Sequence, residues 1–234
     1  MEYTKLFRES LNITLNNLPA YGMAALILTF GSIFTITAPS LLYGFVSMLV
    51  KGARQETVRT ADIFSGFHSG NFVRGWVYFL FMLAVIVVLM LIWVILFVFA
   101  GVIMVLAGPL TGQVLTETMV VALIMVVAIV LACVAAVPAI LVIYVLPLFV
   151  IRKYAITEAI SESIQVVKDN FIASTIVCTI IALVALAGVV PYYAGFFLQW
   201  PQWLSLSGYI AGIVLTTPLS QQILVNTTFE LMDE

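Results

Sequence analysis

Few side chains in this 234-residue sequence could take part in catalysis, and those few are scattered. Glu158 and Glu162 stand one helical turn apart, the spacing of a carboxylate pair on one helix face. The only histidine, His68, lies in a charged loop among serines and glycines. A solvated helix face that pairs with basic residues, and a solvated loop histidine, explain these residues without catalysis.

The two cysteines and the known catalytic motifs point the same way. Cys133 and Cys178 fall in apolar stretches, away from any CxxC pair or histidine, which disfavours metal and redox chemistry. Buried thiols that act as small apolar groups are the expected alternative. The sequence contains no HExxH, GxSxG, P-loop or Rossmann fingerprint. We therefore expect no enzyme activity, no metal and no cofactor.

The composition indicates a surface that faces lipid. Hydrophobic residues make up 64% of the chain and charged residues 9%, whereas a soluble domain carries roughly 25% charged residues. The net charge of -2 is too small to suggest a nucleic-acid partner. We expect membrane lipids as partners, together with a partner membrane protein or a second copy of the chain.

The basic residues lie in three short zones, separated by long stretches without charge. The zones are Lys5 and Arg8; Lys51, Arg54, Arg59 and Arg74; and Arg152, Lys153 and Lys168. Basic loops stay on the cytoplasmic side of a membrane, so an even number of crossings should separate any two zones. A crossing needs about 20 apolar residues. Both termini should then be cytoplasmic, and the aromatic segment near 191–203 should lie outside.

These constraints predict an all-α, polytopic membrane helical bundle with about six membrane segments, formed as a single integral membrane domain over 1–234. The predicted elements are a surface helix at 3–17, a hairpin at 18–50, a cytoplasmic loop at 51–71, a long hairpin at 72–151, a surface helix at 154–169 and a hairpin at 171–226. A multi-pass protein of the cell membrane is the expected location.

Each hairpin has its own predicted turn. Residues 18–50 are short for two crossings, so either a tight turn near Pro39 or a re-entrant helix pair satisfies the constraints. The long hairpin should turn at 108–112, with its excess length absorbed by tilt, by protrusion or by a break near Pro138 or Pro147. The last hairpin should turn outside, from Pro191 to Trp203, where Tyr and Trp rings favour the headgroup level.

The two surface helices are amphipathic and similar in sequence. Tyr3, Phe7, Leu11, Leu15 and Leu18 form one stripe with helical spacing, and the second helix has a stripe of the same kind: Ile156, Ile160, Ile164, Val167 and Phe171. Such helices lie along a bilayer with the apolar side down. Glu9-Ser10-Leu11 aligns with Glu162-Ser163-Ile164, which indicates an internal repeat of a surface helix followed by a membrane hairpin.

Polar residues inside the apolar stretches are uncharged, which disfavours proton coupling through a membrane carboxylate. The best candidates for a polar contact lie near the end of the last segment: Thr216, Thr217, Gln221, Gln222 and Asn226. Hydrogen bonding between helices, or a cap at the membrane interface, is the simpler explanation for this group. Glycines and alanines at 184–188 and 208–212 predict close helix packing in the last hairpin, and Pro218 predicts a kink.

A pattern in the second half resembles a known family. It consists of a proline-bearing span, LPLFV at 146–150, then a surface helix with EAISES at 158–163, and then Asn170 before the next span. This layout resembles a diffuse family of six-span bacterial and archaeal membrane proteins. The family includes the membrane domain attached to some glycerophosphodiester phosphodiesterases. The resemblance implies the six-span layout and no particular activity.

The sequence is compatible with two main functions. The first is a non-catalytic scaffold or auxiliary subunit that binds partner proteins or lipids. The alternative is a small transporter or carrier for an apolar or lipid-like molecule, with the hairpins as moving halves. An intramembrane enzyme is the third and least favoured possibility. A polar groove to which several segments contribute would favour the carrier.

Overall fold

The computed structural model describes residues 2–111, 122, 125–126, 128–130 and 136–232. Within these ranges the regular elements are helices and no strand is present, which agrees with the predicted all-α class. The chain divides into two compact units. One combines Met1–Phe79 with Val142–Glu234, and the other is Leu80–Leu141.

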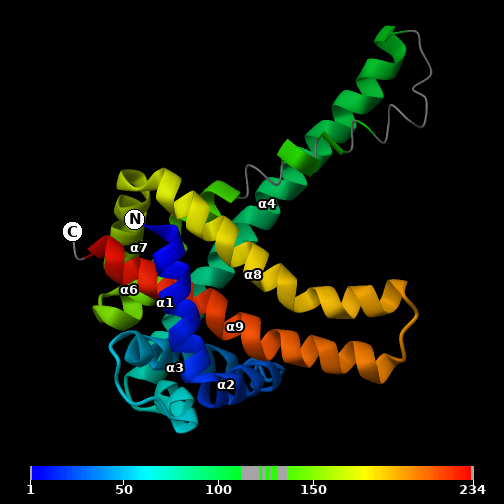
Figure 1. Ribbon diagram of the computed structural model, residues 1–234. Helices are drawn as coiled ribbons and strands as arrows, with labels where there is room; N and C mark the ends of the chain where they lie inside the picture. The colour runs from blue at the N-terminus through cyan, green and yellow to red at the C-terminus, as the bar shows by residue number, and fades with distance from the viewer. Residues whose placement is uncertain (1, 112–121, 123–124, 127, 131–135, 233–234) are drawn as a thin grey trace. The chain divides into compact units, whose positions relative to one another are not determined.

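The first unit contains most of the helices (Figure 1). In chain order they are α1 (Tyr3–Asn16), α2 (Leu18–Gly31), α3 (Ala38–Ala53), the 3-10 helix η1 (Thr60–Phe67), α6 (Val145–Ile151), α7 (Ile156–Asp169), α8 (Phe171–Phe197) and α9 (Gln202–Met232). Helix α4 (Asn71–Thr111) begins in the first unit and continues into the second. The predicted cytoplasmic loop therefore contains η1.

Within the described part of the chain, three helices are long and apolar enough to span a membrane: Asn71–Phe99, Phe171–Phe197 and Gln202–Met232. A fourth span is added if α1 and α2, which meet at an angle of 86°, are counted as one. Asn17 stands at this bend, where its side-chain amide donates to the carbonyl of Ile13 over 3.0 Å. Pro19 follows at the start of α2, where a helix needs no amide donor.

Helix α3 is the central helix of the first unit and packs against α2, η1, α6 and α9. Its side chains are buried around most of its circumference, with Phe45, Met48 and Leu49 fully enclosed. A second cluster joins α1, α8 and α9 through four buried side chains: Leu6, Val177, Leu219 and Ile223. These two clusters hold the polar ends of α3 and α9 beside α1.

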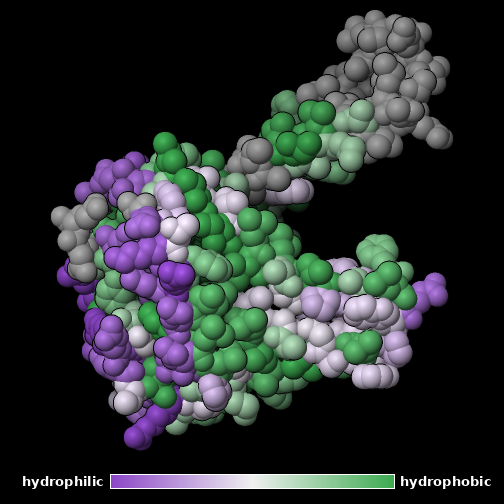
Figure 2. All heavy atoms as spheres, in the orientation of Figure 1, coloured by the Kyte–Doolittle hydropathy of each residue, from purple (hydrophilic) through white to green (hydrophobic). Residues whose placement is uncertain are grey.

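The surface of the first unit separates polar from apolar residues. Figure 2 shows hydrophilic side chains gathered on the face over α1 and α7, near the two ends of the chain, and hydrophobic side chains along α8. On α1 the buried row is Leu6, Ser10 and Thr14, which leaves Phe7 and Leu15 of the predicted stripe exposed. An exposed apolar stripe beside a polar face suits a helix at a membrane interface.

The structure tests three of the predicted turns and breaks. The turn predicted from Pro191 to Trp203 is present but shorter, at 198–201, because α8 continues as a helix through Pro191 to Phe197. The turn expected at 108–112 is still helical through Thr111, and residue 112 lies outside the described ranges. The second arm of that hairpin is described only in part, and its helix breaks at 142–144, just before Pro147. In a continuous helix the Pro147 ring would clash with the carbonyl of Ile143, four residues earlier, which explains the break.

Candidate functional site

A chain of buried polar side chains links three helices of the first unit. The Tyr21 hydroxyl of α2 donates to Gln222 Oε1 of α9 over 3.1 Å. Gln222 Nε2 donates to Asn226 Oδ1 over 2.8 Å, and Asn226 Nδ2 donates to Ser10 Oγ of α1 over 2.9 Å. Tyr21, Gln222 and Ser10 are fully buried. Polar groups in such a setting need partners, and each link here supplies one.

The sequence-predicted polar group is thus divided by the structure. Gln222 and Asn226 belong to the buried chain, because a spacing of four residues places them on one helix face. Thr216 lies nearer the N-terminal end of α9 than Gln222. Its hydroxyl donates to the carbonyl of Gly212 and packs against Gly188 of α8. The carbonyl of Thr217 accepts a hydrogen bond from the Ser220 hydroxyl. Gln221 is half-buried and takes no part in the series of hydrogen bonds from Tyr21 to Ser10.

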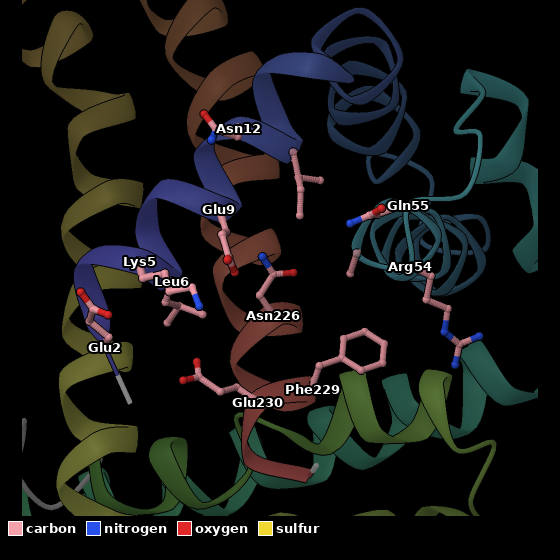
Figure 3. A pocket seen from close by; sticks show the side chains of 12 residues that line it. Glu2, Lys5, Leu6, Glu9, Asn12, Arg54, Gln55, Asn226, Phe229 and Glu230 are labelled. Carbon is pink, nitrogen blue, oxygen red and sulfur yellow. The ribbon is translucent and has the colours of Figure 1, made fainter. Parts of the chain in front are cut away.

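Asn226 also opens onto a polar cleft of about 610 Å³. Figure 3 shows Lys5 and Glu9 of α1 on one side of this cleft, Arg54 and Gln55 from the end of α3 on the other, and Asn226 and Phe229 of α9 between them. The remaining lining residues are Glu2, Leu6, Asn12, Ile13, Ala53 and Glu230. The volume lies within the range of about 300–1,000 Å³ that small-molecule sites occupy.

The cleft carries charges of both signs. Three carboxylates, Glu2, Glu9 and Glu230, face it together with the cationic groups of Lys5 and Arg54. Among the described residues no ion pair joins these five groups. The Arg54 guanidinium lies 5.8 Å from the centre of the Phe229 ring instead. The C-terminal carbonyls of α3 add partial negative charge at the same place. A ligand with an amine and an anionic group would therefore meet complementary charges.

The residues first considered for catalysis lie apart from this cleft. Glu158 Oε2 accepts the amide of Ala155 over 3.0 Å and so caps the N-terminus of α7, rather than pairing with a basic residue as expected. His68 is exposed, with Nδ1 3.2 Å from the carbonyl oxygen of Ser65. Within the described ranges no group of three or more His, Cys, Asp or Glu is placed to hold a metal ion.

Two residues of the second basic zone, Lys51 and Arg74, hold neighbouring segments together. Lys51 Nζ and Asp62 Oδ1 form an ion pair of 2.7 Å, and Asp62 Oδ2 also accepts the amide of Arg59. Burial acts to raise the pKa of Asp62, but the hydrogen bonds from Lys51 and Arg59 and their positive charges outweigh it and lower this pKa. Arg74 donates to the carbonyls of Phe149 and Tyr154, over 2.7 and 2.9 Å.

Several residues of the site were missed from the sequence. Tyr21 is the first polar side chain inside the second helix, and Ser10 belongs to the repeated Glu-Ser pair, so both gave a weak signal. The grouping of Glu9, Arg54 and Glu230 gave none, because it depends on contacts between α1, α3 and α9. No family model, curated protein or solved structure matches this chain. The family resemblance drawn from the second half of the sequence stays a prediction.

Proposed function

We propose that this chain is a multi-pass protein of the cell membrane, with both termini cytoplasmic, that acts as a non-catalytic scaffold or auxiliary subunit and binds lipid. The ligand of the polar cleft is a zwitterionic phospholipid, held by its headgroup. The observation that carries the proposal is the cleft itself, where cationic and anionic side chains face one space without pairing with one another.

The charges of the cleft suit an amine and a phosphate on one molecule. Glu9 and Glu230 offer carboxylates to an ammonium group, and Asn226 offers an amide beside them. Arg54 offers a planar donor group to a phosphate. Both acyl chains can remain in the bilayer, because α1, which lines the cleft, also exposes the apolar side chains Phe7 and Leu15.

A smaller cleft supports the internal repeat as part of this proposal. It measures about 180 Å³ and lies beside the C-terminal end of α9, where α7 lines it. Its lining includes Glu162, Gln165 and Val166, which align with Glu9, Asn12 and Ile13 of the larger cleft. The two surface helices thus present equivalent positions to the end of one helix.

Native mass spectrometry of the protein purified in mild detergent tests the proposal. Phosphatidylethanolamine, phosphatidylcholine and phosphatidylglycerol would each be titrated against the wild type and against Glu9→Gln. We expect one zwitterionic lipid to bind per chain, and Glu9→Gln to weaken that binding about tenfold, which corresponds to roughly 1.4 kcal/mol. Glu56→Gln is the matched control, because Glu56 is exposed and lies outside the cleft.

Three results would decide between the parts of the proposal and its alternative. Equal loss of lipid in Glu9→Gln and Glu56→Gln would mean that the cleft is not the headgroup site. A stoichiometric partner protein that stays bound would establish the auxiliary-subunit role. Movement of labelled lipid between the leaflets of vesicles that contain the purified protein would favour the carrier instead.

A further inference from the structure

The first hairpin, α2 and α3, ends in an exposed apolar tip. At this tip Ile33, Phe34 and Ile36 expose 74%, 69% and 69% of their surfaces, and Phe30 is exposed beside them. The hairpin is also short. At about 1.5 Å per residue its helices of 14 and 16 residues reach roughly 21 and 24 Å, whereas the hydrocarbon core is about 30 Å thick.

Three of the four hydroxyl side chains at 29–37 donate to backbone carbonyls of the hairpin, and Thr35 does not. The hydroxyls of Thr29 and Ser32 donate to the carbonyls of Ala25 and Leu28, each four residues earlier. The Thr37 hydroxyl donates to the carbonyls of Gly31 and Phe34. Such bonds within the hairpin are what a lipid-exposed turn requires, because the hydrocarbon core offers no other partner.

The contacts of the loop after α3 show which segments lie beside the hairpin. This segment runs back along α3 in three contacts: Lys51 with Asp62, Gly44 with the carbonyl of Ile63, and Ser40 with Gly66. Beyond this segment, Gly75 of α4 lies against the carbonyl of Pro39, in the first turn of α3. The N-terminal end of α3 therefore lies beside the start of α4.

The start of α4 belongs to the basic, polar side of the first unit. Arg74, next to Gly75, donates to the carbonyl of Tyr154, which directly follows Arg152 and Lys153. If α3 crossed the bilayer, the segment beside it would carry Asp62, His68 and Arg74 through the hydrocarbon core. Charged groups there cost several kcal/mol each. A shallow hairpin avoids this cost: α3 then lies close to one face of the membrane, and only the tip before its first residue reaches the acyl chains.

We infer that α2 and α3 form a re-entrant hairpin, which enters the membrane from the cytoplasmic face, buries the tip at 30–37 among lipid acyl chains and returns to the same face. This inference rests on the membrane location proposed above. It leaves the parity of crossings unchanged, because a re-entrant pair and two full crossings both return the chain to the same side.

Single cysteines in a cysteine-free background (Cys133→Ala with Cys178→Ala) test the hairpin. Phe34→Cys reports on the tip, Gln199→Cys on the turn between α8 and α9, Glu56→Cys on the loop and Leu183→Cys on the exposed apolar face of α8. An environment-sensitive fluorophore is attached to each purified protein, which is then placed in phosphatidylethanolamine–phosphatidylglycerol vesicles. Quenching by nitroxide acyl chains is compared with quenching by a water-soluble ion, and an impermeant maleimide is applied to intact cells.

We expect the probe at residue 34 to be quenched by acyl-chain nitroxides, as at residue 183, and to resist the soluble quencher. In intact cells Gln199→Cys should react with the maleimide and Phe34→Cys should not. Reaction of Phe34→Cys at the rate of Gln199→Cys would establish a full crossing and overturn the inference. Soluble quenching at residue 34 without reaction from outside would place the tip in cytoplasmic water and also overturn it. If residue 183 is quenched by the soluble ion as well, the membrane location itself has failed.

Discussion

At the scale of single residues, the polar chain from Tyr21 to Ser10 is the feature most sensitive to change. Its members come from α2, α9 and α1, so each hydrogen bond also fixes the relative position of two helices. Gln222 is the central member, because its amide both accepts from Tyr21 and donates to Asn226. Removal of this amide leaves a fully buried phenol without its partner.

Gln222→Leu should therefore destabilise the protein by about 1–2 kcal/mol, since a buried donor loses its acceptor. Gln221→Leu is the matched control, with an expected effect below about 0.5 kcal/mol, because Gln221 is half-buried and takes no part in the hydrogen bonds from Tyr21 to Ser10. Thermal unfolding of both variants in the same detergent measures the difference. Equal melting temperatures would show that the hydrogen bonds from Tyr21 to Ser10 add nothing to stability.

The Lys51–Asp62 pair should make stability depend on pH in the acid range. The pKa of Asp62 is lowered in the fold, so the pair contributes fully above the unfolded value of about 3.9 and is lost as pH falls through the folded value. Lys51 is more than a third exposed, which limits the contribution to roughly 0.5–1 kcal/mol. Asp62→Asn should lower the melting temperature at pH 7, and this difference from the wild type should shrink as the pH falls below the unfolded value. A constant difference across this range would contradict the assignment.

The sequence predicted two of the four residues in the hydrogen-bonded series from Tyr21 to Ser10, and few of the residues that line the cleft. A spacing of four residues on an expected helix is visible in any sequence, so Gln222 and Asn226 could be grouped in advance. Tyr21 and Ser10 lie more than 200 positions from their partners on α9, and helical periodicity carries no information about such contacts. The same holds for Arg54 and Glu230, which meet only through the packing of α3 and α9.

At the scale of elements, small residues determine how closely the helices approach. In the last hairpin a side chain at Gly212 would meet the carbonyl of Gly188, and one at Gly208 would meet Pro191. This confirms the close packing predicted from the glycines and alanines of these segments. The contact of Gly208 with Pro191 also explains why the proline does not end α8: the neighbouring helix packs directly against it, and proline is tolerated in packed membrane helices.

Gly44→Ala should disturb the joint between α3 and η1. A Cβ at this position would meet the backbone carbonyl of Ile63, which cannot move as a side chain can, so we expect a loss of about 1–3 kcal/mol. Gly101→Ala is the control, because a Cβ there meets nothing within 4 Å and a helical alanine is favoured by about 0.5–1 kcal/mol. Melting temperatures in detergent compare the two. A neutral Gly44→Ala would mean that η1 does not lie directly against α3.

Helix existence was easier to predict from this sequence than helix length. Uncharged stretches and amphipathic stripes predicted α1, α7, α8 and α9 close to their observed starting points. Pro191 was less informative, since it lies inside α8 and does not begin the turn, whereas Pro218 lies inside the last helix as expected and a break does occur just before Pro147. The 3-10 helix η1 was missed, because its eight residues carry no periodic pattern and it is held by contacts with α3.

At the scale of the whole molecule, the placement of charge limits where the chain can lie. The three helices that are long enough to span contain few charged residues, whereas the polar face of the first unit gathers both amphipathic helices and the two clefts. This separation supports the proposed topology, in which basic segments and both termini stay on the cytoplasmic side. A lipid headgroup site on that face would lie at the depth of the inner leaflet.

The most direct test of this topology uses reporters of membrane side. One fusion would carry a reporter at position 112, after α4, and another at the C-terminus after position 234. Each is compared with a reporter that is active only outside the membrane and one that is active only inside. The account predicts opposite sides, with position 112 outside and the C-terminus inside. The same side for both would contradict the paired crossings on which the proposed topology depends.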